Sequence, residues 1–412
     1  MVILELLFIL ALQGECSIKI PLTRKINTKS RELTTLPTED KLKTYMGFTY
    51  YYFLANFSVG TPPQYFTVGI HSEDSIFYLE TKPCDKCPSY FLNKFDPSAS
   101  STYEEIDDSF GYHPDIFYLH NSSYEFDIIV SKDIMKFGNE ETKQYLALLT
   151  FPFESDFKFN FSVYDGALGL SLRKSNYDFP TFIDSLKSAG IIDKKLYSLY
   201  TSKVYLNSSF EIEDYPSSHL EFGDYDLETY SSTGKILVTI PITMDDYIGS
   251  YSFDIYFDGV KLNADGGLAF SIGVYYMGAQ KTDFYEIFNH LTNTLAHNCT
   301  LDYLESSFSC ICDDVYSMPS MYFKYKEVSF LLNQSELWAK KDDICISHIL
   351  KSYDDHWHIG DILLSKYYAI FDFDNNEISL APAALEVIEK EEDITSSKGI
   401  YIAVAFSLLA LS

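Results

Sequence analysis

Apolar and polar positions alternate along most of the chain, and this pattern predicts strands. From about Tyr50 onward, period-two segments rich in aromatic and β-branched residues are separated by turn sequences such as Gly60-Thr-Pro-Pro. The predicted strands are 50–59, 65–70, 75–79, 126–130, 235–240 and 251–257. Helical periodicity is rare, and 182–189 and 284–295 are its better examples. The pattern therefore predicts a mostly β fold.

A weak internal repeat suggests two similar halves. In the first half, an apolar strand enters a polar turn at His71, and the apolar-glycine segment 164–170 follows later. In the second half, strand 268–270 enters a turn at Ser271, and the segment 357–362 follows. Each half thus pairs an apolar strand ending in a polar turn with a later strand that contains glycine.

Length agrees with two halves, because 412 residues exceed what one hydrophobic core usually fills. We divide the chain into five parts, whose boundaries follow the changes in composition. They are a signal peptide at 1–16, a basic pro-segment at 17–47, an N-terminal β lobe at 48–226, a C-terminal β lobe at 227–384, and an acidic linker with a hydrophobic tail at 385–412.

The charge is strongly negative, with a formal net charge of −28. Nucleic acid is excluded as a partner, because phosphate binding requires clustered cations. The one basic stretch, 17–31, carries Lys19, Arg24, Lys25, Lys29 and Arg31 and no acid. Opposite charges would dock this stretch on the anionic body; the alternative is a solvated basic arm.

Both ends of the chain resemble processing signals. The apolar run 2–12 is typical of a secretory signal, although a basic region before it is missing. The apolar run 400–411 is too short to span a bilayer. It is either a GPI-attachment signal, with small residues at 396–397, or an amphipathic or docked tail. We therefore expect a secreted or surface-anchored protein, or one that stays in the lumen of the secretory pathway.

Cysteines and glycosylation motifs fit the secretory route. Removal of the signal would leave six cysteines, an even number that favours disulfides in a secreted chain. Zinc is disfavoured at Cys84-x-x-Cys87, because one pair supplies too few ligands. His356 and His358 share one strand face, but a metal would need further ligands, so we expect no metal and no cofactor. The glycosylation motifs are at Asn56, Asn121, Asn160, Asn207, Asn298 and Asn333.

Several motifs together resemble the pepsin-like aspartic peptidases, the A1 family, over nearly the whole chain. The resemblance is carried by Ala55–Val68, Phe95–Tyr103, Tyr164–Leu170, Leu220–Asp226, Trp357–Asp361, Tyr367–Asp372 and Ile378–Pro382. It implies a bilobal fold, with two β-barrel-like lobes and a cleft for an extended peptide. It also implies the disulfides Cys84–Cys87 and Cys312–Cys345, with Cys299–Cys310 as an additional bridge.

The catalytic positions depart from the family pattern. Members cleave peptides with two aspartates, one at each D-T-G turn, which share a proton so that one acts as base and the other as acid. Here the first turn is His71-Ser72-Glu73 and the second is Ser271-Ile272-Gly273. Neither aspartate is present. Ser72 could still form the hydrogen bond between the turns that the family's threonine makes, whereas Ile272 could not.

The flap also departs from the pattern. The family's Tyr-Gly-x-Gly hairpin is replaced by a segment that contains Asn121, a glycosylation motif near the tyrosine position, and Tyr124. Rescue acids are poorly placed, because a register that brings Asp74 into the turn would misplace two strand positions, and Asp265 comes too early in the chain. Glu73 is a further weak candidate.

Another chemistry would use His71 and Ser271, which the resemblance places opposite each other. A serine beside a histidine can become a nucleophile, but it also needs an orienting acid and an oxyanion hole, and the sequence indicates neither.

We therefore predict a monomeric pseudoprotease that binds a peptide or protein in its cleft without cutting it. The alternatives are an active acid endopeptidase with a noncanonical site and a storage glycoprotein with an empty cleft.

Overall fold

A computed structural model describes most of the two predicted lobes. The described residues are 17–27, 50–72, 75–82, 93–106, 115–119, 122–138, 140–152, 165–171, 180–201, 218–245, 247–262, 267–302, 306–352 and 354–384. Several predicted features lie outside them: segments 1–16, 28–47 and 385–412, Glu73, Asp74, Cys84, Cys87, Asn121, Asn160, Asn207 and Asp265. No helix among the described residues is long and apolar enough to cross a membrane.

Six strands of the first half close into a barrel, because strand pairing runs around the ring and returns to β2. In order around the ring they are β2 (Tyr50–Val59), β3 (Gln64–His71), β9 (Gly166–Gly169), β4 (Phe77–Glu80), β8 (Glu140–Pro152) and β7 (Ser122–Phe137). The helix α2 (Phe182–Ser188) packs Phe182 onto Phe57 and Phe137 of the barrel. A capping box between Thr181 and Asp184 begins this helix.

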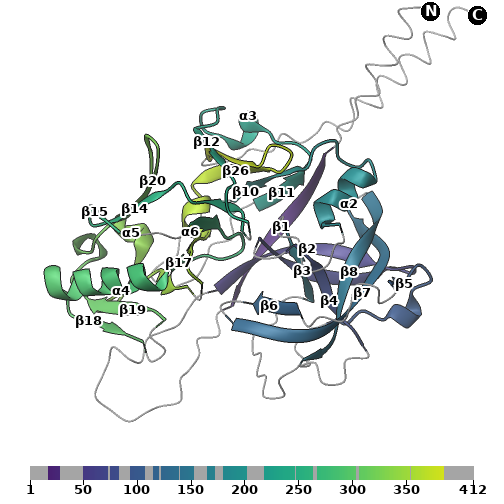
Figure 1. The fold of residues 1–412 in the computed structure, drawn as a ribbon, viewed down its shortest axis with the longest axis horizontal. Helices are drawn as coiled ribbons and strands as arrows, with labels where there is room; N and C mark the ends of the chain where they lie inside the picture. Colours follow the sequence, from purple (N-terminus) through teal and green to yellow (C-terminus); the bar gives the residue numbers. More distant parts are fainter. Residues whose placement is uncertain are drawn as a thin grey trace, which may run out of the picture.

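A second group of strands joins the lobes. The barrel continues through β1 (Ile18–Asn27) into β11 (Ser218–Phe222), β10 (Leu196–Tyr200), β26 (Tyr367–Asp372), β27 (Glu377–Pro382) and β12 (Val238–Pro241). Figure 1 shows yellow β26, from the end of the chain, beside teal β10 and β11 from its middle. Backbone hydrogen bonds thus tie residues of the two lobes into one continuous sheet.

The basic stretch is held by strand pairing rather than by charge alone. Alternation in Ile18-Lys-Ile-Pro-Leu22 gives β1 one apolar face, and Ile18, Ile20 and Leu22 are buried in the core. β1 pairs with β11 through its first five residues, Ile18 to Leu22, and with β2 through its last five, Thr23 to Asn27. One ion pair supports this placement, between Lys19 and Glu221 at 3.8 Å. An exposed lysine contributes little to stability in such a pair, so burial of the apolar face is the larger contribution.

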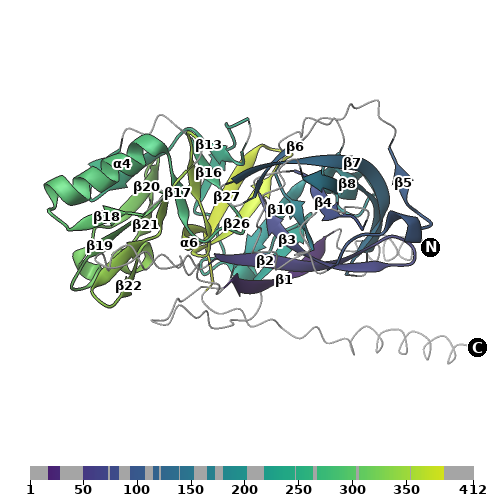
Figure 2. The same ribbon diagram turned by 90° about the horizontal axis from the view of Figure 1, so that it is seen from below.

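The second half forms three smaller sheets. One contains β13 (Gly249–Ser250), β16 (Leu268–Phe270), β25 (Trp357–Ile359), β17 (Met277–Ala279) and β24 (Ile349–Lys351). Another contains β15 (Val260–Lys261), β14 (Asp254–Phe257), β20 (Met321–Tyr325) and β21 (Val328–Leu332). The last contains β18 (Cys299–Leu301), β19 (Phe308–Ile311), β23 (Ile344–Ser347) and β22 (Trp338–Lys341). Figure 2 shows α4 (Lys281–Asn289) flanking these green strands.

The remaining elements are short. They are η2 (Pro97–Ala99), β5 (Glu104–Glu105), β6 (Asp115–Leu119), α3 (Leu227–Tyr230), the π-helix η3 (His290–Thr294), η4 (Val315–Ser317), α5 (Gln334–Leu337) and α6 (Asp361–Leu364). The mostly β, bilobal prediction is confirmed, and the closed barrel is found in one sheet, that of the first half.

Element boundaries were predicted less well than element types. The helix expected at 284–295 begins at Lys281 and gives way to a π-helix at His290. The strand expected at 235–240 begins only at Val238, and the apolar Ile236 and Leu237 before it are 39% and 46% exposed. The strand expected at 126–130 is part of a long hairpin arm, and its register shifts after Asp127.

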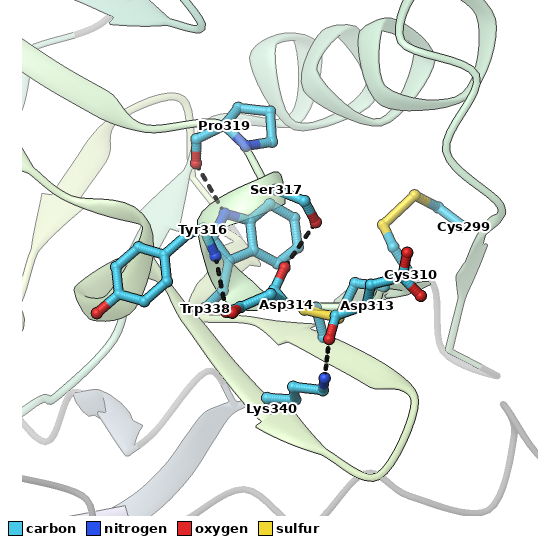
Figure 3. Close-up of a disulfide and its surroundings, with 11 residues drawn as sticks. Cys299, Cys310, Asp313, Asp314, Tyr316, Ser317, Pro319, Trp338 and Lys340 are labelled. Atoms are coloured by element: carbon cyan, nitrogen blue, oxygen red, sulfur yellow. Dashed lines mark hydrogen bonds between the residues drawn. A yellow bond between two sulfur atoms is a disulfide. The ribbon is translucent and has the colours of Figure 1, made fainter.

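Two of the three expected disulfides are present. Cys299 and Cys310 lie directly opposite each other on β18 and β19, with their Cα atoms 3.9 Å apart (Figure 3). Cys312 is bonded to Cys345 on β23. The buried Trp338 lies beside these bridges and donates its indole N–H to the carbonyl of Pro319 at 2.9 Å (Figure 3).

Candidate active site

The predicted internal repeat brings two similar turns together. β3 ends at His71 and runs parallel to β9, with His71 opposite Gly169. β16 ends at Phe270 and runs parallel to β25, with Phe270 opposite Ile359. The pairing in each half is the one that the sequence repeat predicts, between an apolar strand that enters a polar turn and a later strand of the same half.

Ser72 links the two turns, as the sequence predicts. Its hydroxyl donates to the carbonyl of Phe270 at 2.8 Å and accepts from the N–H of Ile272 at 2.9 Å. All three residues are buried. The side chain of Ile272 is fully buried and apolar, so it makes no hydroxyl bond in return. One half of a reciprocal link between the turns is therefore retained.

The second turn packs tightly against the first. Gly273 has φ +82°, and a Cβ added there would lie 2.4 Å from the carbonyl oxygen of Ile70. Only glycine accommodates both this backbone conformation and this approach. The turn glycine is thus explained in the second half, whereas its counterpart Glu73 is outside the described residues.

The hydroxyl of Ser271 is bonded to a histidine that the sequence analysis did not assign to it. Its Oγ lies 3.1 Å from Nδ1 of His358, on the neighbouring strand β25. From the sequence, His71 was the histidine considered as a partner of Ser271, in an alternative chemistry that lacked an orienting acid. His71 is half-buried, and its ring lies 6.3 Å from that of Tyr78. Ser271 itself is 2% exposed.

An acid completes this arrangement on the far side of His358. Nε2 of His358 lies 2.9 Å from Oδ2 and 3.0 Å from Oδ1 of Asp354. The carboxylate also accepts hydrogen bonds from the hydroxyls of Tyr247 and Ser352, each at 2.8 Å, and from the backbone N–H of His356 at 3.0 Å. Asp354, four residues before His358 in the chain, therefore fixes the orientation of the imidazole by a hydrogen bond.

Hydrogen bonds keep Asp354 ionised. Burial alone would raise its pKa, but the hydrogen bond and charge of His358, together with the hydroxyls of Tyr247 and Ser352, outweigh burial and hold the pKa well below its usual range. From the sequence, His358 was predicted only to share a strand face with His356, with a metal pair as the alternative. Among the described residues, no group of three or more His, Cys, Asp or Glu side chains is placed to hold a metal.

A hollow of about 260 Å³ opens between residues of the two halves. Ser171, which follows β9, lines it together with Asp245 and Tyr247 of the second half and Phe373 and Asn376 near the β26–β27 turn. Tyr247 also packs its ring edge-on against His358, with ring centroids 5.2 Å apart. The hollow therefore adjoins the Ser271–His358–Asp354 chain through Tyr247.

The flap region forms a hairpin even though the family's motif is missing. β6 pairs with β7, and Leu119 lies opposite Ser122. Replacement of the motif therefore leaves the two strands paired. Alternation of apolar and polar residues in β6 and β7 is sufficient to pair the two strands without that motif. Tyr124 lies on β7, and Asn121 is outside the described residues.

Other predicted residues have surface or structural positions. Asn56, Asn298 and Asn333 are exposed, so a glycan on them would not require unfolding. Asp165, in the segment that resembles the family's glycine strand, is buried and accepts from the backbone N–H of Thr67 at 2.8 Å. This aspartate therefore has a structural role, since its carboxylate also accepts two hydrogen bonds from Asn93.

Comparisons with known proteins agree with the fold. The family model described as eukaryotic aspartyl protease matches residues 51–383. Pepsin II-1 of Oryctolagus cuniculus is 26% identical, over 92% of this chain and 99% of its own length. Pepsin A of Bos taurus is 26% identical, over 88% and 92%. Chymosin of Bos taurus is 23% identical, over 79% of each chain.

Proposed function

Because the chain belongs to the eukaryotic aspartyl protease family, we propose that it is a secretory-route member that binds a peptide or protein between its lobes without cutting it. One observation carries this proposal. The frame of the two turns is kept through Ser72, Ile272 and Gly273, while His71 and Ser271 stand at the two acid positions.

Peptide hydrolysis by this family's chemistry needs two carboxylates. Close together, they share one proton, which gives the site a base to activate water and an acid to protonate the leaving amine. An imidazole and a hydroxyl do not share a proton in this way. Ser271 is also already bonded to His358, so its hydroxyl is directed away from a role as a second acid.

Binding does not require these acids. An extended peptide is recognised by backbone hydrogen bonds and by pockets for its side chains. The β6–β7 hairpin and the hollow beside Tyr247 are the features that support peptide binding here. At about 260 Å³ the hollow has room for one large side chain of a ligand.

The first experiment tests hydrolysis. Purified protein is incubated with an unfolded, alkylated protein substrate at pH 3–5, with and without a statine-type inhibitor, and the products are identified by mass spectrometry. We expect no inhibitor-sensitive cleavage. Inhibitor-sensitive cleavage would instead establish the alternative function, an acid endopeptidase with a noncanonical site.

The second experiment tests binding. Fluorescent octapeptides of varied sequence are titrated at neutral pH against the wild type and Asp245→Trp, which places a large ring in the hollow. Asp193→Trp is the matched control, since Asp193 is equally exposed but does not line the hollow. We expect Asp245→Trp alone to lose at least about tenfold in affinity, or about 1.4 kcal/mol. Absence of peptide binding by the wild type would favour a storage role with an empty cleft.

A further inference from the structure

Three side chains form a continuous hydrogen-bonded chain at the second turn. Ser271 follows β16, and His358 lies on β25, which runs parallel to β16. The hydroxyl oxygen of Ser271 is 3.1 Å from Nδ1 of His358, and Nε2 of the same ring is 2.9 Å from the Asp354 carboxylate. Hydroxyl, imidazole and carboxylate are therefore connected in the order that base-activated serines require.

The carboxylate determines which ring nitrogen carries the proton. The carboxylate of Asp354 already accepts from two hydroxyls and one backbone N–H, so it acts as an acceptor and Nε2 of His358 donates to it. When His358 is neutral, Nδ1 is then the acceptor, and the hydroxyl of Ser271 lies 3.1 Å from it. The hydroxyl thus donates to a base whose other nitrogen is held by an anion.

The ring is also fixed in position. Tyr247 packs edge-on against His358 with centroids 5.2 Å apart, and its hydroxyl donates to Asp354 at 2.8 Å. The hydroxyl of Ser352 donates to the same carboxylate at 2.8 Å. A base held by several neighbours loses little entropy when it accepts a proton from the serine.

We propose that Ser271 is a nucleophile that is acylated by small, activated carboxylic esters. Its Oγ forms a bond with the acyl carbon while its proton moves to Nδ1 of His358, and Asp354 stabilises the imidazolium. The alcohol then leaves with that proton as the C–O bond breaks. Water repeats the two steps on the acyl-serine and releases the acid. This activity goes beyond peptide binding and uses neither of the family's two aspartate positions as an acid.

Burial of Ser271 sets the substrate class. The residue is 2% exposed, so an acyl group must be small to approach its hydroxyl without displacing buried neighbours. An ester with a good leaving group depends less on oxyanion stabilisation than an amide does. Small esters, and not peptide bonds, are therefore the assigned substrates.

The test is covalent labelling of the full-length protein by an alkyne-tagged methyl fluorophosphonate, followed by peptide mapping. We expect an adduct at Ser271 in the wild type and none in Ser271→Ala. His358→Gln should label at least about 100-fold more slowly, because the base is gone. Ser347→Ala is the matched control, since Ser347 is also 2% exposed but its hydroxyl accepts from the N–H of Ile349; it should label like the wild type.

Asp354 acts through His358 and is a positioning residue, so its test needs a readout that simple destabilisation would not change. Asp354→Asn should slow labelling by at least about 100-fold, and Asp354→Glu should recover part of that loss, although both remove the native side chain. Turnover of p-nitrophenyl acetate is measured in parallel and should follow the same order. A folded wild type with no adduct at Ser271, or a His358→Gln rate equal to that of the wild type, would refute the proposal.

Discussion

The hydroxyl of Ser72 is the group whose removal most directly tests how the two turns are held together. Ser72→Ala deletes one oxygen and leaves the backbone in place. That oxygen is 2.8 Å from the carbonyl of Phe270 and 2.9 Å from the N–H of Ile272. Because Ser72 is in one lobe and both partners are in the other, the substitution removes two hydrogen bonds between lobes.

The expected cost follows from the burial of all three residues. Ser72 and Phe270 are each 3% exposed, and Ile272 is 0% exposed, so water does not readily replace the lost oxygen. A buried donor or acceptor without a partner costs about 1 to 3 kcal/mol. One of each is left here, so we expect the free energy of unfolding to fall by about 2 to 6 kcal/mol.

The assay is urea unfolding followed by intrinsic fluorescence, with Ser185→Ala as the control. The hydroxyl of Ser185, which is also buried, donates to the carbonyl of Thr181 at 3.1 Å. That carbonyl already accepts the helix bond from the N–H of Ser185 at 3.0 Å, so no backbone group loses its only partner. The control should change stability by less than about 1 kcal/mol. If the two variants were equally stable, the link between the turns would contribute nothing, and the reasoning would be wrong.

Three further predictions concern the acid positions, the pH dependence and the disulfides. The double variant His71→Asp plus Ser271→Asp should regain little acid peptidase activity, measured on the unfolded substrate; full recovery would show that only two side chains were missing. Asp354, whose pKa is lowered in the folded state, stabilises the protein above its unfolded pKa of about 3.9 and loses this effect as the pH falls below that value. The difference in urea midpoint between wild type and Asp354→Asn should therefore be larger at pH 7 than at pH 2.5. In the same unfolding assay, removal of the Cys312–Cys345 bridge, whose cysteines are 33 residues apart, should lower the free energy of unfolding by about 4 kcal/mol. Removal of the Cys299–Cys310 bridge, with a separation of 11, should lower it by about 3 kcal/mol.

The local parts of the site could be predicted from the sequence. Each turn follows an apolar strand and is flanked by residues of a recognisable motif, so His71, Ser72, Ser271 and Ile272 could be assigned from neighbouring positions alone. The bond made by Ser72 was predicted from residue type, because a serine hydroxyl can replace the one on a threonine.

The long-range part could not be predicted. Ser271 and His358 are 87 positions apart, and they meet because β16 and β25 run parallel. A sequence shows the alternation of each strand but not which side chain of a partner strand lies beside a turn. Asp354 is the one signal that could have been used, since an acid four residues before a histidine can reach it. Period-two alternation in Ile18–Leu22 likewise indicates a strand with one buried face, as β1 proves to be. The charges of this stretch instead predicted docking by electrostatic attraction.

Ser271 and His358 are best understood as matched to each other. A carboxylate at position 271 would occupy the place from which the serine hydroxyl now reaches Nδ1 of His358. The ring would then lie between two anions, and Asp354 already holds its other nitrogen. A protonated imidazole beside the new carboxylate would lower its pKa, so the proton would be held by the acid at position 71 and not shared between the two. Replacing His71 and Ser271 alone would therefore leave the new acid at position 271 against a histidine that disfavours proton sharing.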